Sequence, residues 1–497
     1  MERSVIKVAA WGLPLLLGAV AATPAAADEL SDLRHDMQQM KQQYDGELQR
    51  LQKDYESKLQ QMERRLKAAE DKAEAAQKAA AAQQQPTVAP PPPAVAAIPE
   101  SQIAAPEPQI AAPQPPPAPP IAAGPGGTPS SAGAFNPAIG AVLEGQATSQ
   151  SRNPNTYRLP GFALGDSAGP LPRGLSINES EINLNANVDQ ALYGNLTLAF
   201  EPDNTVGVEE GFIQSTSLPY GLTLRGGRFF SGVGYLNEQH AHTWDFADQA
   251  LPYQAFLNTQ YDDDGVQLRW LAPTSRFLEF GAEAFRGAAF PAGGDDNHND
   301  GVGAWSGFVH TGDDIGDSAS YRVGLSYLHT AAKNRATDDV DGSGARVTDI
   351  FSGTDNTYIA DGVFKWAPNG NFVERYLKLQ GEFFLRQEQG AFNGVNFSGT
   401  TQTGFYAQGV YQFMPQWRLG LRYDQVHATS LGPGFAGTTL DNLASTPRRY
   451  SAMVDYSTSE FGRFRLQYEN DHSRPQTAHE FILQYIVSIG AHGAHQY

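Results

Sequence analysis

Two histidines, His240 and His242, lie two residues apart between two acidic residues, Glu238 and Asp245. If the chain is extended here, side chains at positions i and i+2 share one face. Both imidazoles could then reach one ion while a carboxylate completes the ligand set. Imidazole and carboxylate ligands suit zinc and neighbouring divalent metals. The alternative is a pair of solvated or hydrogen-bonded loop histidines, because a metal site needs three or four ligands in defined geometry.

The stretch that holds these histidines, residues 231–263, is acidic, and basic residues are concentrated much later in the chain. Its carboxylates, including those at its return, are Glu238, Asp245, Asp248, Asp262, Asp263 and, directly after it, Asp264. The basic group comprises Lys378, Arg386, Arg418, Arg422, Arg463 and Arg465. Facing each other across a pore constriction, the two groups would set up a transverse field that orders water and disfavours large apolar solutes. In the alternative interpretation, the arginines pair with nearby carboxylates such as Glu382, Asp424 and Glu469 as structural ion pairs.

The sequence gives no sign of catalytic chemistry. It has no Gly-x-Ser-x-Gly nucleophile motif and no metalloprotease helix motif, and its other histidines and serines show no characteristic spacing. We expect neither an enzyme nor a bound cofactor, and no nucleic-acid partner.

The elements that position these residues begin with an export signal. Arg3 and Lys7 flank the start of an apolar segment at residues 8–21, and three alanines at 25–27 suit a signal peptidase. We therefore expect a signal peptide over residues 1–27. No later apolar run approaches the length of a membrane-spanning helix. The absence of cysteine fits passage through an oxidising compartment.

Two segments of unusual composition follow. In residues 28–84, apolar residues recur at steps of three and four from Leu30 to Ala69, which predicts a periplasmic coiled coil with stutters. Residues 85–133 are rich in proline and alanine and predict an extended, semi-rigid linker.

Residues 134–497 show repeated period-two alternation, which predicts an all-β transmembrane barrel of about sixteen antiparallel strands. In each run one face is apolar and the other polar or charged, as expected for a lipid-facing exterior around a wet lumen. The expected strands lie near residues 139–148, 175–188, 192–201, 206–216, 221–230, 264–272, 276–287, 302–311, 319–330, 357–367, 373–388, 401–413, 417–428, 448–458, 461–471 and 478–490.

The connections between these strands alternate between short turns and mostly longer loops, which is typical of outer-membrane barrels with both termini in the periplasm. The longest connection, residues 231–263, is the third of the long ones. It carries apolar residues such as Tyr235, Trp244 and Phe256. Exposed loops seldom carry so many apolar side chains, so we expect this loop to fold into the lumen.

The barrel region resembles outer-membrane porins of the phosphate-selective porin O/P type and the related zinc-regulated outer-membrane proteins. The resemblance covers roughly residues 134–497 and rests on FNPAIG (135–140), LPGFALG (159–165), RGGRFFSGVGYLNEQHAHTWDFAD (225–248), DDDGVQLRWLAP (262–273) and the ending IGAHGAHQY. It implies a trimeric sixteen-stranded channel with the third loop as its constriction. It also implies that the terminal aromatic residue, Tyr497, is the signal read by the barrel-assembly machinery.

These features predict a porin in the outer membrane of a Gram-negative bacterium, with a periplasmic N-terminal region and self-association as a homotrimer. It would form a water-filled channel for small hydrophilic solutes or ions. Alternatives within transport are a substrate-specific anion channel, for example for phosphate, and a divalent-metal channel. An alternative of another class is a barrel anchor that tethers outer-membrane lipid to the cell wall through the coiled coil. We further expect the loop carboxylates to give mild cation preference, and micromolar zinc to reduce conductance through His240 and His242.

Overall fold

The computed structural model describes Lys67, residues 137–294 and residues 301–490. Apart from Lys67, the expected signal peptide, coiled coil and linker lie outside these residues, as does the terminal Tyr497. Among the residues described, no helix has the length and apolar character needed to cross a membrane.

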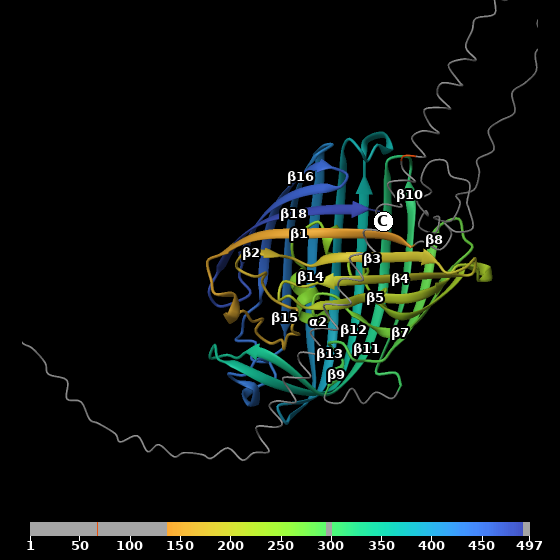
Figure 1. The fold of residues 1–497 in the computed structure, drawn as a ribbon. Helices are drawn as coiled ribbons and strands as arrows, with labels where there is room; N and C mark the ends of the chain where they lie inside the picture. Colours follow the sequence, from red (N-terminus) through yellow and green to blue (C-terminus); the bar gives the residue numbers. More distant parts are fainter. Residues whose placement is uncertain (1–66, 68–136, 295–300, 491–497) are drawn as a thin grey trace, which may run out of the picture. The chain divides into compact units, whose positions relative to one another are not determined.

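One closed antiparallel sheet forms the barrel (Figure 1). Its strands, in chain order, are β1 (Ala138–Gln150), β3 (Ser180–Asn187), β4 (Leu192–Phe200), β5 (Val206–Ser215), β6 (Leu222–Phe230), β7 (Asp262–Leu271), β8 (Phe277–Phe285), β10 (Ala304–Ile315), β11 (Ala319–Val340), β12 (Arg346–Trp366), β13 (Tyr376–Phe392), β14 (Val395–Met414), β15 (Trp417–Ala428), β16 (Arg448–Ser459), β17 (Gly462–Asp471) and β18 (Ala478–Gly490). The short β2 (Gly174–Ile177) runs into β3, and both pair with β1. A two-residue strand, β9 (Gly293–Gly294), pairs in parallel with β11.

Pairing of β18 with β1, from Gly140↔Gly490 to Gln150↔Glu480, closes the ring. With β2 counted together with β3 and β9 left out, the described residues contain sixteen barrel strands. The predicted antiparallel barrel of about sixteen strands is therefore confirmed.

Apolar side chains lie on the outside of the barrel and charged side chains lie on the inside, which is the reverse of the arrangement in a soluble protein. Along β15, Leu419 and Leu421 point outward and are 50% and 69% exposed, whereas the next residue, Arg422, points inward and is 4% exposed. Other strands repeat the pattern, with outward Val266, Leu268 and Trp270 on β7. A strand with period two can place its apolar residues on only one face, and here that face is the exterior.

Seven short connections lie at one end of the barrel, which we call the turn end. They follow β3, β5, β7, β10, β12, β14 and β16. The connections that follow β1, β6, β8 and β15 at the opposite end are much longer. All connections longer than nine residues therefore lie at the end opposite the turn end, as predicted, but the connections that follow β4, β11, β13 and β17 at that end are short.

Two hairpins extend further than expected. The strands predicted near 319–330 and 357–367 are parts of β11 and β12, which span 22 and 21 residues. Likewise β13 and β14 continue up to the two-residue turn between Phe392 and Val395. The prediction of long loops at these places was wrong because polar, threonine-rich strands beyond the apolar belt lack the alternation by which strands were recognised.

A β-bulge in β5 changes the direction of one acidic side chain. Thr197 pairs with Glu210 and the next residue, Leu198, pairs with Val208, so Glu209 is the extra residue. A bulge places two consecutive residues opposite one on the neighbouring strand and redirects side chains. As a result, Glu209 and Glu210 both reach the same side chain on the inside of the barrel, His240.

Candidate functional site

The connection between β6 and β7, residues 231–261, lies against the inner wall of the barrel. It contains a 3-10 turn, η3 (Ala241–Thr243), and a short helix, α2 (Leu251–Leu257), whose seven residues are all buried. Helix α2 contacts β14 and β15, and the ring of Phe256 stacks 5.7 Å from that of Phe384 on β13. The helix ends at Asn258, which adopts the left-handed conformation that asparagine tolerates. We call residues 231–261 the inner loop.

One buried carboxylate on β13 holds the start of the inner loop. The backbone N–H groups of Tyr235 and Leu236 donate to the two oxygens of Glu382 at 3.0 and 3.1 Å. The hydroxyl of Tyr253 donates to the same carboxylate. These bonds join the loop to the far wall of the barrel.

Asp245 of the inner loop pairs with two basic residues of the wall. Its carboxylate lies 3.0 Å from Nζ of Lys378 and 3.1 Å from the guanidinium of Arg418. Burial opposes ionisation, but Lys378 and Arg418 outweigh it and hold the pKa of Asp245 below its usual range. Asp245 is therefore a charged partner of the wall.

Asp248 forms the second contact of this kind. Its oxygens lie 2.8 Å from Arg422 and 2.7 Å from Arg449. Burial again opposes ionisation, but Arg422 and Arg449 lower the pKa of Asp248. Wall carboxylates complete the network, since Arg422 also contacts Asp424 at 3.1 Å and Arg449 contacts Glu469 at 3.3 Å.

The structure brings only part of the predicted acidic group to the predicted basic group. Glu238 pairs with Arg269 of β7, which was not in the basic group. Asp263 accepts backbone N–H bonds from Gly287 and Ala288, and Asp264 pairs with the half-exposed Arg228. No contact between residues 262–264 and the basic group is found within the described part of the chain.

The other predicted basic residues also have partners. Arg386 is buried beside Gln402 and Glu388, and its guanidinium lies over the ring of Phe256. Arg465 pairs with Asp455 at 3.0 Å. Arg463 donates to the carbonyl oxygen of His242 at 2.7 Å. The basic wall thus serves largely to hold the inner loop and to pair with wall carboxylates.

Seven basic side chains lie within three residues of the turn end of their strands, on the inward face. They are Arg225, Arg269, Arg322, Lys365, Lys378, Arg418 and Arg463, which we call the basic collar. All seven keep partial contact with solvent. Lys365 stands directly opposite Lys378 in the β12–β13 register, and like charges in directly opposed positions repel each other. Sequence analysis missed four members because their strands were read singly, whereas the collar appears only when strand ends are aligned.

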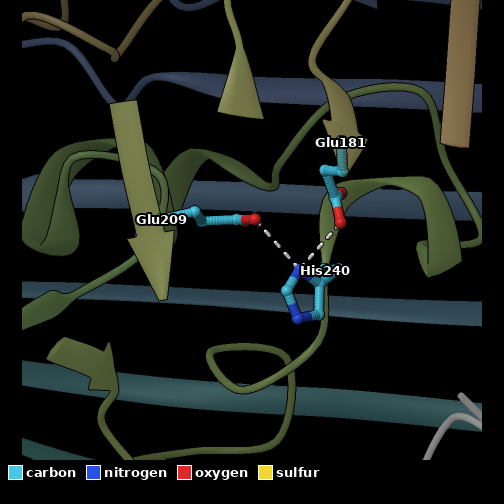
Figure 2. Close-up of side chains that lie close together, drawn as sticks. All are labelled: Glu181, Glu209 and His240. Carbon is cyan, nitrogen blue, oxygen red and sulfur yellow. Dashed lines mark hydrogen bonds and ion pairs between the residues drawn. The ribbon is translucent and has the colours of Figure 1, made fainter. Parts of the chain in front are cut away.

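His240 lies among three carboxylates, two of which, those of Glu181 and Glu209, are drawn in Figure 2. Its Nδ1 atom is 3.2 Å from Oε2 of Glu181 on β3 and 3.1 Å from Oε2 of Glu209 on β5. Its Nε2 atom is 3.3 Å from Glu210. Burial disfavours the charged imidazolium, but Glu209 and Glu181 outweigh burial and raise the pKa of His240 well above its ordinary value.

His242 joins the same group through its Nδ1 atom, which lies 2.7 Å from Oε1 of Glu181. The two imidazoles stack with ring centroids 5.7 Å apart. The predicted extended chain is wrong here, because Ala241–Thr243 forms a 3-10 turn. The predicted carboxylates Glu238 and Asp245 pair elsewhere. Those that surround the histidines come from β3 and from the β5 bulge, about 30 to 60 residues earlier in the chain.

Comparison with known proteins found no matching family model. A protein of Aquifex aeolicus (strain VF5) described as uncharacterized is 30% identical over 401 residues, which cover 74% of this chain and 82% of the relative. The chain therefore belongs to the same protein family as this relative.

Solved structures of similar fold are outer-membrane proteins, including porins and channels. The OmpT loop-deletion mutant of Vibrio cholerae matches with 11% identity and a TM-score of 0.46, over 71% of this chain and 99% of that one. The channel DcaP of Acinetobacter baumannii matches with 11% identity and a TM-score of 0.45, over 71% and 96%. An anion-selective porin from Comamonas acidovorans matches with 10% identity and a TM-score of 0.46, over 71% and 99%.

Proposed function

We propose that this chain is an outer-membrane porin that forms a water-filled channel for passive diffusion of small hydrophilic solutes or ions. The observation that carries the proposal is the closed barrel with apolar side chains outside and charged side chains inside. Only a helix or a closed barrel satisfies its backbone hydrogen bonds in lipid. A charged interior suits a barrel that encloses water.

The inner loop is proposed as the constriction. It lies against the wall between β13 and β17 through Glu382, Lys378, Arg418, Arg422 and Arg465. These contacts leave the loop little freedom to move. Permeating solutes would pass between it and the remaining wall.

A preference for small anions, with phosphate among the candidates, is favoured over a divalent-metal channel by the basic collar. The expectation of cation preference assumed loop carboxylates free to act on permeant ions. In the structure Asp245, Asp248 and Glu238 are each paired with basic residues. Collar residues Lys378, Arg418 and Arg463, together with Arg465, share only two carboxylates, Asp245 and Asp455. This part of the lumen wall therefore keeps an excess of positive charge. Rings of Arg and Lys favour anions in pores.

The purified full-length protein, reconstituted into planar bilayers, tests the function. We expect discrete conductance steps. In a salt gradient, we expect a reversal potential displaced toward the equilibrium potential of the anion. A barrel that serves only as a cell-wall anchor would give no steps, which would refute the porin proposal. A reversal potential displaced toward the cation would refute the anion preference alone.

We also propose that the porin is a homotrimer whose coiled coil, residues 28–84, extends into the periplasm and contacts the cell wall. The heptad-like spacing from Leu30 to Ala69 supports self-association. Tyr497 would be the signal for the barrel-assembly machinery. Cross-linking in native membranes should give trimers, and exclusively monomeric product would contradict this assembly.

A further inference from the structure

We propose that Glu181, Glu209 and His240 bind one divalent transition-metal ion of the zinc type, and that this ion fastens the inner loop to β3 and β5. The inference goes beyond the proposed pore, since a barrel can conduct with or without the metal. It rests on ligand geometry, on the groups that hold the ligands, and on the charge of the surroundings.

The three side chains offer ligand atoms at the required separations. Nδ1 of His240 and one oxygen from each glutamate all lie within 4.8 Å of one another. Nδ1 is 3.2 Å from Glu181 and 3.1 Å from Glu209. Two ligands bound to tetrahedral zinc at about 2.0–2.1 Å are separated by roughly 3.3 Å. Figure 2 shows both carboxylates directed at the same imidazole nitrogen.

Two of these ligands, His240 and Glu181, are oriented by hydrogen-bonding neighbours, as the ligands in known metal sites are. A histidine that binds zinc through one nitrogen commonly donates its other N–H to a carboxylate. Here Nε2 of His240 lies 3.3 Å from Oε2 of Glu210. His242 contacts Oε1 of Glu181 at 2.7 Å, which leaves Oε2 directed at His240. The ring of Phe230 packs edge-on against His240, with centroids 5.5 Å apart.

The negative charge around His240 favours a cation that carries more than the single charge of a proton. Glu181, Glu209 and Glu210 all contact His240. A fourth carboxylate, Glu179, interacts with Glu209, and its Oε1 atom is buried without a hydrogen-bond partner among the described residues. Even if His240 and His242, which contacts Glu181, were both protonated, they would supply two positive charges against four carboxylates. Buried carboxylates that lack compensation are costly, and a divalent ion in place of the proton on Nδ1 of His240 would add one more positive charge.

The ligand set also selects the class of metal. Calcium and magnesium prefer oxygen ligands alone. One imidazole with two carboxylates fits zinc, cobalt or manganese. The β5 bulge makes the set possible, because it turns Glu209 and Glu210 toward the same histidine.

Isothermal titration of the EDTA-stripped full-length protein in detergent with zinc chloride tests the proposal. We expect one high-affinity site per chain in the wild type. His240→Gln and Glu209→Gln should each weaken binding at least tenfold, and Glu210→Gln should weaken it about 10- to 100-fold. His310→Gln is the matched control, because His310 also contacts an inward glutamate, Glu279 at 3.3 Å, but lies outside the group. It should leave the zinc affinity unchanged.

X-ray absorption of the zinc-loaded wild type gives a readout that does not depend on the folding of any variant. The expected first shell contains a single imidazole with oxygen ligands. A shell with two or more imidazoles would overturn the assignment, as would absence of wild-type binding. Equal zinc affinity in the folded wild type and in folded His240→Gln would also overturn it. A group that is merely ion-paired would instead show altered thermal stability in His240→Gln without any zinc binding in the wild type.

Discussion

Replacing Asp245 with asparagine tests whether the negative charge of this residue offsets the positive charges of the wall. Asp245→Asn keeps the shape of the side chain and removes one negative charge from beside Lys378 and Arg418, which lie 3.0 and 3.1 Å away. Two unit charges about 4 Å apart interact by about 1 kcal/mol in water and about 4 kcal/mol at an effective dielectric constant of 20. Even the lower figure corresponds to about a fivefold change in the local concentration of each permeant ion, upward for anions and downward for cations.

We therefore expect the anion-to-cation permeability ratio of the Asp245→Asn pore to rise about fivefold or more. The assay is the reversal potential of reconstituted channels in a salt gradient, measured at low ionic strength because salt screens the effect. The same variant should destabilise docking of the loop, since removal of one partner from a buried pair costs about 3–5 kcal/mol. A lower thermal unfolding midpoint would report this loss.

Asp313→Asn is the matched control. Asp313 pairs with Arg276 at 2.9 Å, but the Arg276 side chain is 69% exposed, and exposed pairs contribute little. Neither the reversal potential nor the unfolding midpoint should change. An unchanged reversal potential in Asp245→Asn, or one displaced toward the cation, would show that the Asp245 charge does not offset the collar in the conducting pore.

Three further predictions follow from the same contacts. Because the pKa of Asp248 is lowered in the folded protein, its ionisation should contribute stability above the unfolded pKa of about 3.9, lost as pH falls through the folded pKa. Thermal unfolding of the wild type should thus decline more on acidification below about pH 4 than that of Asp248→Asn, and parallel curves would contradict this. The double variant Lys365→Gln, Lys378→Gln should reduce anion preference in the reversal-potential assay, whereas exposed Lys333→Gln should not, and equal effects would argue against the collar. Removal of residues 28–130 should leave a folded, conducting barrel, because no predicted strand lies there, and loss of single-channel steps would refute this.

The sequence was sufficient to predict the barrel because lipid imposes period two on every strand that crosses it. Leu419 and Leu421 alternate with Arg418 and Arg422 in the sequence and also in exposure. Outside the apolar belt this constraint ends. The distal halves of β11 and β12, in which Thr337 pairs with Asp349, were accordingly mistaken for a loop.

The candidate site was less accessible to sequence reasoning. His240 and His242 stood out by spacing, but their carboxylates come from Glu181, Glu209 and Glu210, which depend on barrel closure and on a bulge. From charge alone, the sequence predicted correctly that Asp245 and Asp248 face the basic residues of the barrel wall. It did not show that Arg449, a second partner of Asp248, belongs to the same network.

The seam between β1 and β18 has a consequence for biosynthesis. Its pairs join residues 330 positions apart (480 − 150) to 350 positions apart (490 − 140), whereas all other neighbouring barrel strands follow each other in the chain. A chain that stops before residue 478 would leave β1 and β17 with rows of unpaired N–H and C=O groups, which hydrocarbon does not tolerate. The topology therefore makes membrane insertion depend on the length of the translated chain, because only a chain that includes β18 can form a closed barrel.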